Sequence, residues 1–513
     1  MKKSGFWAAD WFFGLVIAIA ILILSLVTGF FGGLETKAYD WGVQLTSKQP
    51  SDKVAVIAID DQSIANIGRW PWPRDVHAAM IDKLAGAKAK VIGNTVFFFE
   101  PQQDPGLLYV TKMLEIYNKS NAPAAEPVPA PVVAPPAKPG APTVAVPMQA
   151  TTASAELAQI GAVLNEAEQA LNTDRRLADS IQKAGNVVLP SLFDTTFDPP
   201  VGKPDQALPE YITRSAIGGF SSAGGEFVYA APNPNLPIEQ LGSVAAGIGH
   251  LSPNLDRDGG VRQDITVVDY FGKQYPSLAM VMAAKSLNLA PKDIRVNLGE
   301  SVSLGNLRIL TDEHALMRPY YYKNVGERPA IPIDSFFDVL SGKIPAEKYK
   351  DKIVLIGATA AGVGAIQVTP IGALTPVEAL AHSVSSILKE QFFRTPGWTL
   401  WVSLLMFVLV TVYLVVVLPK LRAGPAAMFT LLIFVALLGT HFALMMGPGI
   451  WVKLMLPAAL LVIGHLLLTT KRFLMTERGK EQSEAAGAES NRMLGLAFQQ
   501  QGQLDMAFDK FRK

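Results

Sequence analysis

Residues 54–77 read VAVIAIDDQSIANIGRWPWPRDVH. The first six are apolar and rich in Val and Ile, a pattern typical of a strand that is buried on both faces. Asp60 and Asp61 follow where this strand reaches the edge of its sheet, which is where ligand sites form in open α/β sheets. Each proline of the WPWP segment removes an N–H and restricts the residue before it. We therefore predict a rigid corner, followed by a helix that begins near Arg74.

Two further apolar runs extend this pattern. Residues 89–99 (AKVIGNTVFFF) and residues 352–359 (KIVLIGAT) both predict buried strands. A strand, a helix and a second strand of this kind imply a right-handed parallel crossover. We therefore expect an α/β fold with a mostly parallel sheet and flanking helices. Gly357, Gly362 and Gly364 follow the third run, but their spacing fits neither a dinucleotide-binding loop nor a P-loop, so a structural turn is favoured.

The string that starts at Ile59, IDDQSIANIGRWPWPRDVHAAMIDKLAGAKAKVIG, resembles the opening of the CHASE type 2 (CHASE2) sensory domain. This family is an extracytoplasmic input module of bacterial membrane receptors. Residues 174–193, 248–287 and 352–388 resemble later parts of the same domain. The resemblance implies an α/β sensor outside the cytoplasm over residues 35–396. It also implies a homodimer, because receptors of this kind are often dimers.

Polar and aromatic side chains around the WPWP corner are the main candidates for a ligand site. A network of arginines and carboxylates that holds the corner against the sheet explains the same residues. Tryptophans are also typical of a core, and a lone histidine on the following helix is typical of a structural position. The candidates are Asp60, Asp61, Arg69, Trp70, Trp72, Arg74 and His77.

A second group of candidates lies in the segment NLDRDGGVR. Asn254, Asp256 and Asp258 alternate as the first ligands of a calcium loop do, but no Glu stands near the twelfth position. An Asp-Gly β-turn between strands explains the same letters and is favoured. Relatives repeatedly have an arginine after this turn. Arg262 is therefore expected to pair with Asp256, with Asp258 or with the carboxylates after the first strand.

Three departures from the family pattern weaken the case for a retained ligand site. Thr95 stands where the second strand of relatives usually ends in an acidic residue, and residues 362–365 read GVGA instead of Gly-Leu-Gly-Asp. The usual Glu-x-His pair is replaced by Glu378 with His382 displaced by two positions. If these groups serve a pocket in relatives, this chain has lost much of its charge.

The composition excludes several classes of protein. Of the 513 residues 50% are hydrophobic and only 17% are charged, which indicates that part of the chain lies in lipid. The net charge is only +1, and no concentrated basic patch that could bind nucleic acid stands out in the sequence. Cysteine is absent, which excludes disulfides, thiolate catalysis and cysteine-ligated zinc. We find no catalytic motif, and we expect no cofactor and no metal.

Four apolar stretches predict transmembrane helices, since about 20 apolar residues cross a bilayer. Lysines and arginines precede the first stretch, lie between the second and third and follow the fourth. The positive-inside rule then places both termini in the cytoplasm, beginning with residues 1–10. The protein is expected to be a multi-pass protein of the bacterial inner (plasma) membrane. The predicted spans are residues 11–31, 398–418, 425–446 and 450–470.

Two segments lie outside this frame. Residues 121–150 are rich in proline and alanine, which favours a disordered insertion in a loop. After the last span, residues 471–490 predict a linker helix, and residues 491–513 resemble one tetratricopeptide repeat. Because one such repeat cannot bury its apolar face alone, we expect either a longer polypeptide or a tail that binds a partner.

These expectations combine into one hypothesis. The chain is the sensory and membrane-anchoring part of a receptor that relays an extracytoplasmic stimulus to a cytoplasmic output domain. The tetratricopeptide-like tail favours a Ser/Thr protein kinase beyond this chain. The alternatives are a cyclase or histidine kinase output, or a non-enzymatic membrane scaffold that recruits partners through its tail.

Overall fold

The computed structural model describes residues 9–102, 104–121, 150–196, 207–222 and 227–512. The chain divides into two compact units. Lys48–Phe392 forms the first, which we call the α/β unit. Met1–Ser47 and Phe393–Lys513 form the second, which we call the helical unit. In sequence, the α/β unit is therefore inserted between two parts of the helical unit.

Five parallel strands form the centre of the main sheet, in the order β14-β1-β15-β2-β3. β1 and β15 pair over their whole lengths, from Val54 opposite Ile353 to Ile59 opposite Ala358. The last long strand in the sequence thus lies between the first two. The strands span Val54–Ile59 (β1), Val91–Asn94 (β2), Val187–Thr196 (β3), Ile333–Ser335 (β14) and Ile353–Ala358 (β15).

The sheet is mixed because antiparallel pairs extend it beyond β3. β6 (Gly247–His250) pairs parallel with β3, whereas β5 (Ala230–Asn235) pairs antiparallel with the later part of β3. β8 (Val267–Tyr270) and β9 (Lys273–Pro276) continue from β5 as an antiparallel hairpin. Counted over the described residues, the sheet has nine strands. The expected α/β sheet with flanking helices is confirmed, and its edge is antiparallel.

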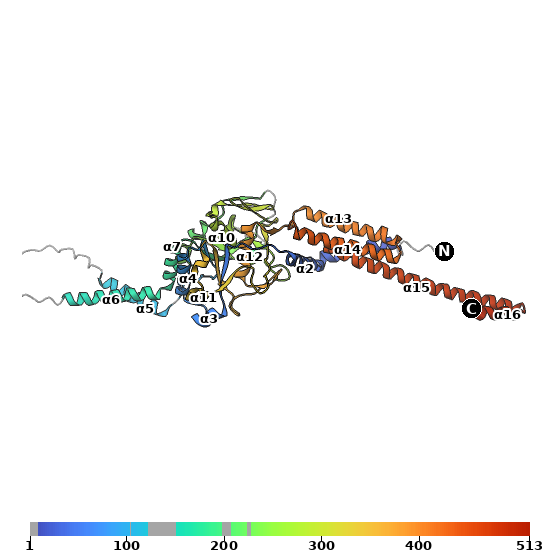
Figure 1. The fold of residues 1–513 in the computed structure, drawn as a ribbon, viewed down its shortest axis with the longest axis horizontal. Helices are drawn as coiled ribbons and strands as arrows, with labels where there is room; N and C mark the ends of the chain where they lie inside the picture. Colours follow the sequence, from blue (N-terminus) through green and yellow to red (C-terminus); the bar gives the residue numbers. More distant parts are fainter. Residues whose placement is uncertain (1–8, 103, 122–149, 197–206, 223–226, 513) are drawn as a thin grey trace, which may run out of the picture. The chain divides into compact units, whose positions relative to one another are not determined.

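Helices cover both faces of this sheet and form a three-layer α/β/α arrangement (Figure 1). Ala55, Ile57 and Ile59 of β1 pack with α4, α7 and α11, whereas Val54 and Val56 pack with α10 and α12. All six β1 side chains are buried, which explains the unbroken apolar run in the sequence. The helices span Arg74–Gly86 (α4), Thr173–Ala184 (α7), Leu278–Ser286 (α10), Phe336–Ser341 (α11) and Pro376–Lys389 (α12).

Shorter elements complete the α/β unit. A small sheet has the order β12-β11-β10-β4, β7 pairs with β13, and β16 forms a hairpin with β17. The strands are β4 (Gly219–Ser221), β7 (Asp264–Ile265), β10 (Ile294–Asn297), β11 (Ser301–Leu304), β12 (Leu307–Leu310), β13 (Leu316–Pro319), β16 (Gln367–Thr369) and β17 (Gly372–Leu374). The short helices are α3 (Asp61–Ile67), α8 (Glu210–Thr213) and α9 (Glu239–Gly242).

Two helices adjoin the segment that is rich in proline and alanine. They are α5 (Pro105–Asn121) and α6 (Ala150–Leu171), and they pack against each other. The predicted disordered insertion over residues 121–150 falls almost entirely on residues 122–149, which lie outside the described residues.

Among the described residues of the helical unit, four helices are long and apolar enough to cross a membrane. They are α1 (Asp10–Thr28), Trp398–Lys420, α14 (Ala423–Met446) and α15 (Met455–Gln500). Of Trp398–Lys420, the first part is α13 (Trp398–Val412), and a π turn and a 3₁₀ turn complete it. Figure 1 shows α13, α14 and α15 lying alongside one another.

Two of these helices are shorter at one end than the predicted transmembrane stretches. The first helix ends at Thr28 because Gly29 adopts the left-handed conformation, and a separate helix, α2 (Phe30–Leu45), follows it. The last helix begins at Met455 rather than at residue 450. The reason is that Ile450 lies in extended backbone that pairs with Arg394, and Trp451 donates a hydrogen bond to the Arg394 carbonyl.

Candidate functional site

Two adjoining cavities lie at the carboxyl ends of the parallel strands. The first, which we call the Trp70 cavity, has a volume of about 400 Å³. Its walls include Thr95 and Phe97, which follow β2, and Ala358 at the end of β15. Open α/β sheets bind ligands at this edge, because loops after neighbouring strands diverge there. The structure therefore places a cavity where the strand pattern predicts one.

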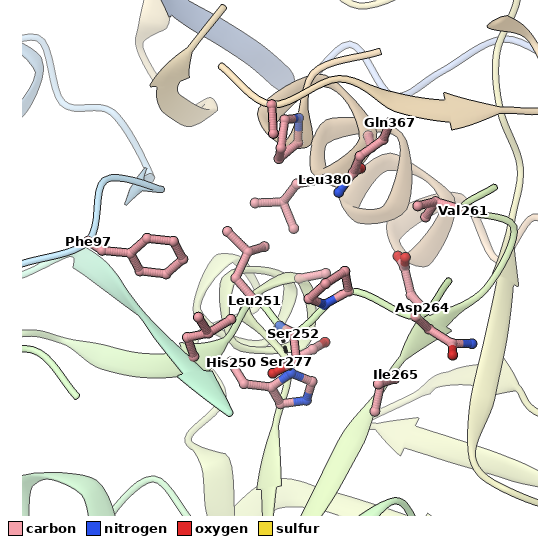
Figure 2. A pocket seen from close by; sticks show the side chains of 17 residues that line it. Phe97, His250, Leu251, Ser252, Val261, Asp264, Ile265, Ser277, Gln367 and Leu380 are labelled. Carbon is pink, nitrogen blue, oxygen red and sulfur yellow. Dashed lines mark hydrogen bonds between the residues drawn. The ribbon is translucent and has the colours of Figure 1, made fainter. Parts of the chain in front are cut away.

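The second, which we call the His250 cavity, has a volume of about 290 Å³. His250 ends β6, and Leu251 and Ser252 follow it into the wall. Figure 2 shows Leu380 and Gln367 on one side of the space and Leu251 and His250 on the other. The two cavities share four wall residues, so they form neighbouring parts of one region. These are Phe97, Leu251, Ala365 and Pro376.

Aromatic rings form one wall of the Trp70 cavity. The rings of Trp70 and Trp72 meet edge to face with their centroids 5.2 Å apart. Trp72 is buried, packs against Phe336 of α11 and donates a hydrogen bond from Nε1 to the Gly68 carbonyl at 2.8 Å. Trp72 therefore belongs to the core, whereas the half-buried Trp70 faces the cavity.

Arg74 holds its helix against a distant part of the chain. Its Nε lies 3.0 Å from a carboxylate oxygen of Asp174 in α7, and its Nη2 donates to the Glu100 carbonyl at 2.9 Å. The guanidinium also lies 4.4 Å from the centroid of the Phe98 ring, a cation–π contact. The arginine–carboxylate network predicted for the WPWP corner therefore uses Asp174, not the aspartates after β1.

His77 lies among aromatic rings and is 2% exposed. Its ring contacts Trp70, Phe98 and Phe336, and its Nδ1 is buried without a hydrogen-bond partner among the described residues. Burial, together with the nearby Arg74 cation, lowers the pKa of His77 to about 3. His77 is therefore neutral near pH 7 and lines the Trp70 cavity as an uncharged ring.

Asp60 and Asp61 have structural contacts outside both cavities. Asp60 caps α3 by accepting a hydrogen bond from the Ser63 amide at 2.9 Å, and it also accepts one from the Ser335 hydroxyl. Asp61 accepts from the Ala361 amide at 3.2 Å. Arg69 is exposed and makes no hydrogen bond to another described residue. The structure thus separates these three predicted site residues from Trp70, Arg74 and His77.

Asp256, Asp258 and Arg262 come together in a turn. Nη1 of Arg262 lies 2.9 Å from Asp256 and 2.8 Å from Asp258, while Nη2 donates to the second oxygen of Asp258. The Asp258 pKa is lowered from its ordinary value because Arg262 donates these hydrogen bonds. Gly259, with φ +77°, closes the turn through a hydrogen bond from its amide to the Asp256 carbonyl. These contacts match the predicted Asp-Gly turn.

A calcium site at this turn gains no support from the structure. Across the residues that the structure describes, no group of three or more histidine and carboxylate side chains could hold a metal ion. The carboxylates of the turn instead face Arg262, which already balances their charge.

The His250 cavity contains polar residues that the sequence alone did not single out. Burial lowers the pKa of His250 to about 3, so its imidazole is neutral. Burial raises the pKa of Asp264 to about 6, and a hydrogen bond with Ser383 partly opposes this rise. Asp264 stands only two residues after Arg262 of the Asp-Gly turn. An acidic residue directly before the strand-forming residues Ile265, Val267 and Val268 is the signal that could have identified it.

Comparisons with known proteins complete the description of the site. A family model described as the CHASE2 domain matches residues 15–418. No curated protein and no solved structure matches this chain significantly.

Proposed function

Because the chain belongs to the CHASE2 family, an extracytoplasmic sensory domain of signalling receptors, we propose that it is the sensory and membrane-anchoring part of a bacterial transmembrane receptor. Its α/β unit receives a stimulus, and its helical unit relays that stimulus to a cytoplasmic output. The observation that carries this proposal is the insertion of a cavity-bearing α/β unit between α2 and α13, which belong to the helical unit.

Two contacts within the helical unit support the relay. At the start of α1, Asp10 forms ion pairs with Lys471 and Arg472 of α15, both at 2.9 Å. In α2, Glu35 accepts a hydrogen bond from the Met455 amide at the start of α15. The two contacts are separated along α15 by about 24 Å, at 1.5 Å per residue. α1 and α2 precede the α/β unit in the sequence. A displacement of these two helices would therefore act on α15 at two separate points.

The continuity of α15 supports the inward direction of the relay. This helix runs from Met455 to Gln500 without a break, and its polar second half follows its apolar first half. A stimulus can shift such a system only by its differential affinity for two arrangements of the chain. Binding in the α/β unit would favour one arrangement of the helical unit. The C-terminal end of α15 would then change its position or rotation.

A Ser/Thr kinase beyond this chain is the output that we favour. The end of α15 and α16 (Leu504–Arg512) form a helical hairpin, in which Gly495 lies directly against the Phe511 ring. This close approach of a small residue to an aromatic ring is typical of helix pairs such as the tetratricopeptide repeat. The alternatives are a cyclase or histidine kinase output, or a scaffold that recruits cytoplasmic partners through this tail.

The orientation in the membrane can be tested cleanly because the chain contains no cysteine. We place the α/β unit outside the inner membrane and both termini in the cytoplasm. Ile366→Cys and Ser483→Cys introduce single thiols at exposed positions in the α/β unit and in α15. A membrane-impermeant maleimide should label Ile366→Cys in spheroplasts, and Ser483→Cys only after lysis. The reverse pattern would overturn the proposal.

The relay itself needs a second experiment. The chain is fused behind Lys513 to a cyclase reporter domain, and a matched fusion lacks residues 48–392. The proposal predicts that reporter activity differs between the two fusions at equal membrane abundance. Equal activity would show that the α/β unit does not influence a domain attached beyond α15.

A further inference from the structure

The His250 cavity has an unusual distribution of charge. Among the residues that line it, Asp264 is the one with a charged side chain near neutral pH, because His250 is neutral. No lysine or arginine of the described residues forms an ion pair with Asp264, and its hydrogen bond comes from Ser383. Nearby Arg262 is already held by two other carboxylates. Asp264 is thus a carboxylate at a cavity wall without a counter-charge.

Two neighbouring side-chain amides supply carbonyl oxygens that can accept, together with NH₂ groups that can donate. The side-chain amides of Asn254 and Gln367 line the same cavity and make no hydrogen bond to another described residue. Figure 2 shows Gln367 across the space from Leu251, with its amide directed toward Leu380. In contrast, the Ser252 hydroxyl is occupied, since it donates to the Phe193 carbonyl and accepts from the Phe193 amide. A ligand would therefore meet one carboxylate, these two amides and the neutral His250 ring, whose Nε2 has no hydrogen-bond partner among the described residues.

Most of the remaining surface of the cavity is apolar. Leu251, Ile265 and Leu380 contribute aliphatic walls, and Phe97 leads into the Trp70 cavity with its aromatic side chains. In the Trp70 cavity the charge of Arg74 is balanced by Asp174. The combined region therefore carries one unbalanced negative charge beside a large apolar surface. Small-molecule sites have this composition, with a few polar groups that fix the orientation of an apolar ligand.

We propose that the His250 cavity binds a small organic amine, whose ammonium group pairs with Asp264 and whose apolar body lies against Leu251 and Leu380. An ammonium group donates three hydrogen bonds. Asp264 would accept one of them, and the side-chain carbonyls of Asn254 and Gln367, which line the same cavity, are the other acceptors that we assign. The apolar body extends past Phe97 toward the Trp70 cavity. This inference rests on the proposed sensory role, because it names the chemical class of the stimulus.

The test uses three probes that share one ring and differ in charge: 5-fluorotryptamine, 5-fluoroindole and 5-fluoroindole-3-acetate. Binding to the full chain in nanodiscs is followed by ¹⁹F line broadening, with empty nanodiscs as the baseline for partition into lipid. We expect the amine to bind at least tenfold more tightly than the uncharged ring, and the carboxylate to bind most weakly. Equal affinities for the amine and the uncharged ring, or no saturable binding of any probe, would overturn the proposal.

Variants test whether Asp264 causes the preference for the amine over the uncharged ring. Asp264→Asn should bring the affinities for the amine and the uncharged ring to within a factor of about two, while Glu313→Gln, an exposed carboxylate outside both cavities, should not change them. Ala365→Trp fills the shared wall and should weaken both probes, whereas Ile366→Trp next to it should not. A tenfold amine preference that survives in Asp264→Asn contradicts the assignment.

The folding of each variant is checked by its melting temperature in the same nanodiscs. The binding measurements do not depend on signal output. A failure of the relay in the cyclase fusions would therefore leave the predicted order of affinities intact. Conversely, a failure of amine binding would leave the labelling and fusion results of the proposed function unchanged.

Discussion

The Glu35 carboxylate accepts hydrogen bonds from the backbone amides at the start of α15, 2.6 Å from Met455 N and 3.3 Å from Leu456 N. Helix N-termini present free N–H groups and a partial positive charge, so a carboxylate is stabilised there. The second oxygen of Glu35 is buried without a hydrogen-bond partner among the described residues. Burial raises the pKa of Glu35 to about 7, although Lys453 and the two amides oppose this rise.

This contact predicts a pH dependence in the helical unit. Since the pKa of Glu35 is raised in the folded state, its protonated form is favoured there. Its contribution to stability is fully present below about pH 4.5 and is lost as the pH rises to about 7. Glu35→Gln, which keeps the shape without the charge, should make the melting temperature less dependent on pH between 5 and 8 than in the wild type.

The measurement is thermal unfolding of the full chain in one detergent at several pH values. Glu477→Gln, which replaces an exposed carboxylate of α15, is the matched control and should behave as the wild type. The same pH slope in Glu35→Gln and the wild type would show that Glu35 does not titrate in this range.

Replacing Arg262 should strongly lower the stability of the α/β unit. Its side chain is 7% exposed and pairs with two carboxylates that would otherwise repel each other. Arg262→Gln should destabilise the α/β unit by about 2 kcal/mol, because it leaves two carboxylates without their partner. Arg257→Gln, at an exposed position of the same turn, should change stability by less than about 0.5 kcal/mol. Chemical denaturation distinguishes the two, and equal effects would contradict the role given to Arg262.

His77 predicts acid sensitivity. Its pKa is lowered in the folded state, so the stability that it contributes is present above about pH 6.5 and is lost as the pH falls toward 3. His77→Phe keeps an aromatic ring among the neighbouring rings and removes the titrating group. Between pH 7 and pH 5 this variant should lose about 2 kcal/mol less stability than the wild type. Urea denaturation at the two pH values tests this, and equal losses would contradict the prediction.

Gly495 predicts a specific effect on the terminal hairpin. A Cβ atom at this position would lie 2.7 Å from the Phe511 ring, so Gly495→Ala should push α16 away from α15. Gly487→Ala is the matched control, because no heavy atom lies within 4 Å of the added methyl group. It should stabilise α15 by up to about 1 kcal/mol. Hydrogen exchange of the α16 amides should accelerate in Gly495→Ala and not in Gly487→Ala.

The apolar runs were sufficient to predict the principal strands. β1 (VAVIAI) and β15 (IVLIGA) are uninterrupted by polar residues and rich in Val and Ile, and the proline pair before Arg74 marks the beginning of α4. These features are local, since burial on both faces and the missing proline N–H act within a few residues. The position of β15 between β1 and β2 is not local, and no short segment of sequence encodes it.

The cavities were harder to predict for the same reason. Asp60 and Asp61 stand at the expected edge of the sheet, but nearby hydroxyl and amide groups occupy them. Arg74 finds its partner in Asp174, 100 positions along the chain. Asp264 lines its cavity because β7 pairs with β13, which brings it under α12. Contacts between residues that are distant in the sequence depend on the tertiary fold, so the spacing of residues along the chain does not reveal them.

The unbroken course of α15 has a geometric consequence for anything attached beyond Gln500. A helix of 46 residues extends about 69 Å and behaves as a stiff rod at this length. Each residue added to its polar half would turn the following chain by about 100° around the axis, whereas seven added residues would nearly restore the original direction. The number of residues in α15 therefore sets the direction in which the following part of the chain points around the helix axis.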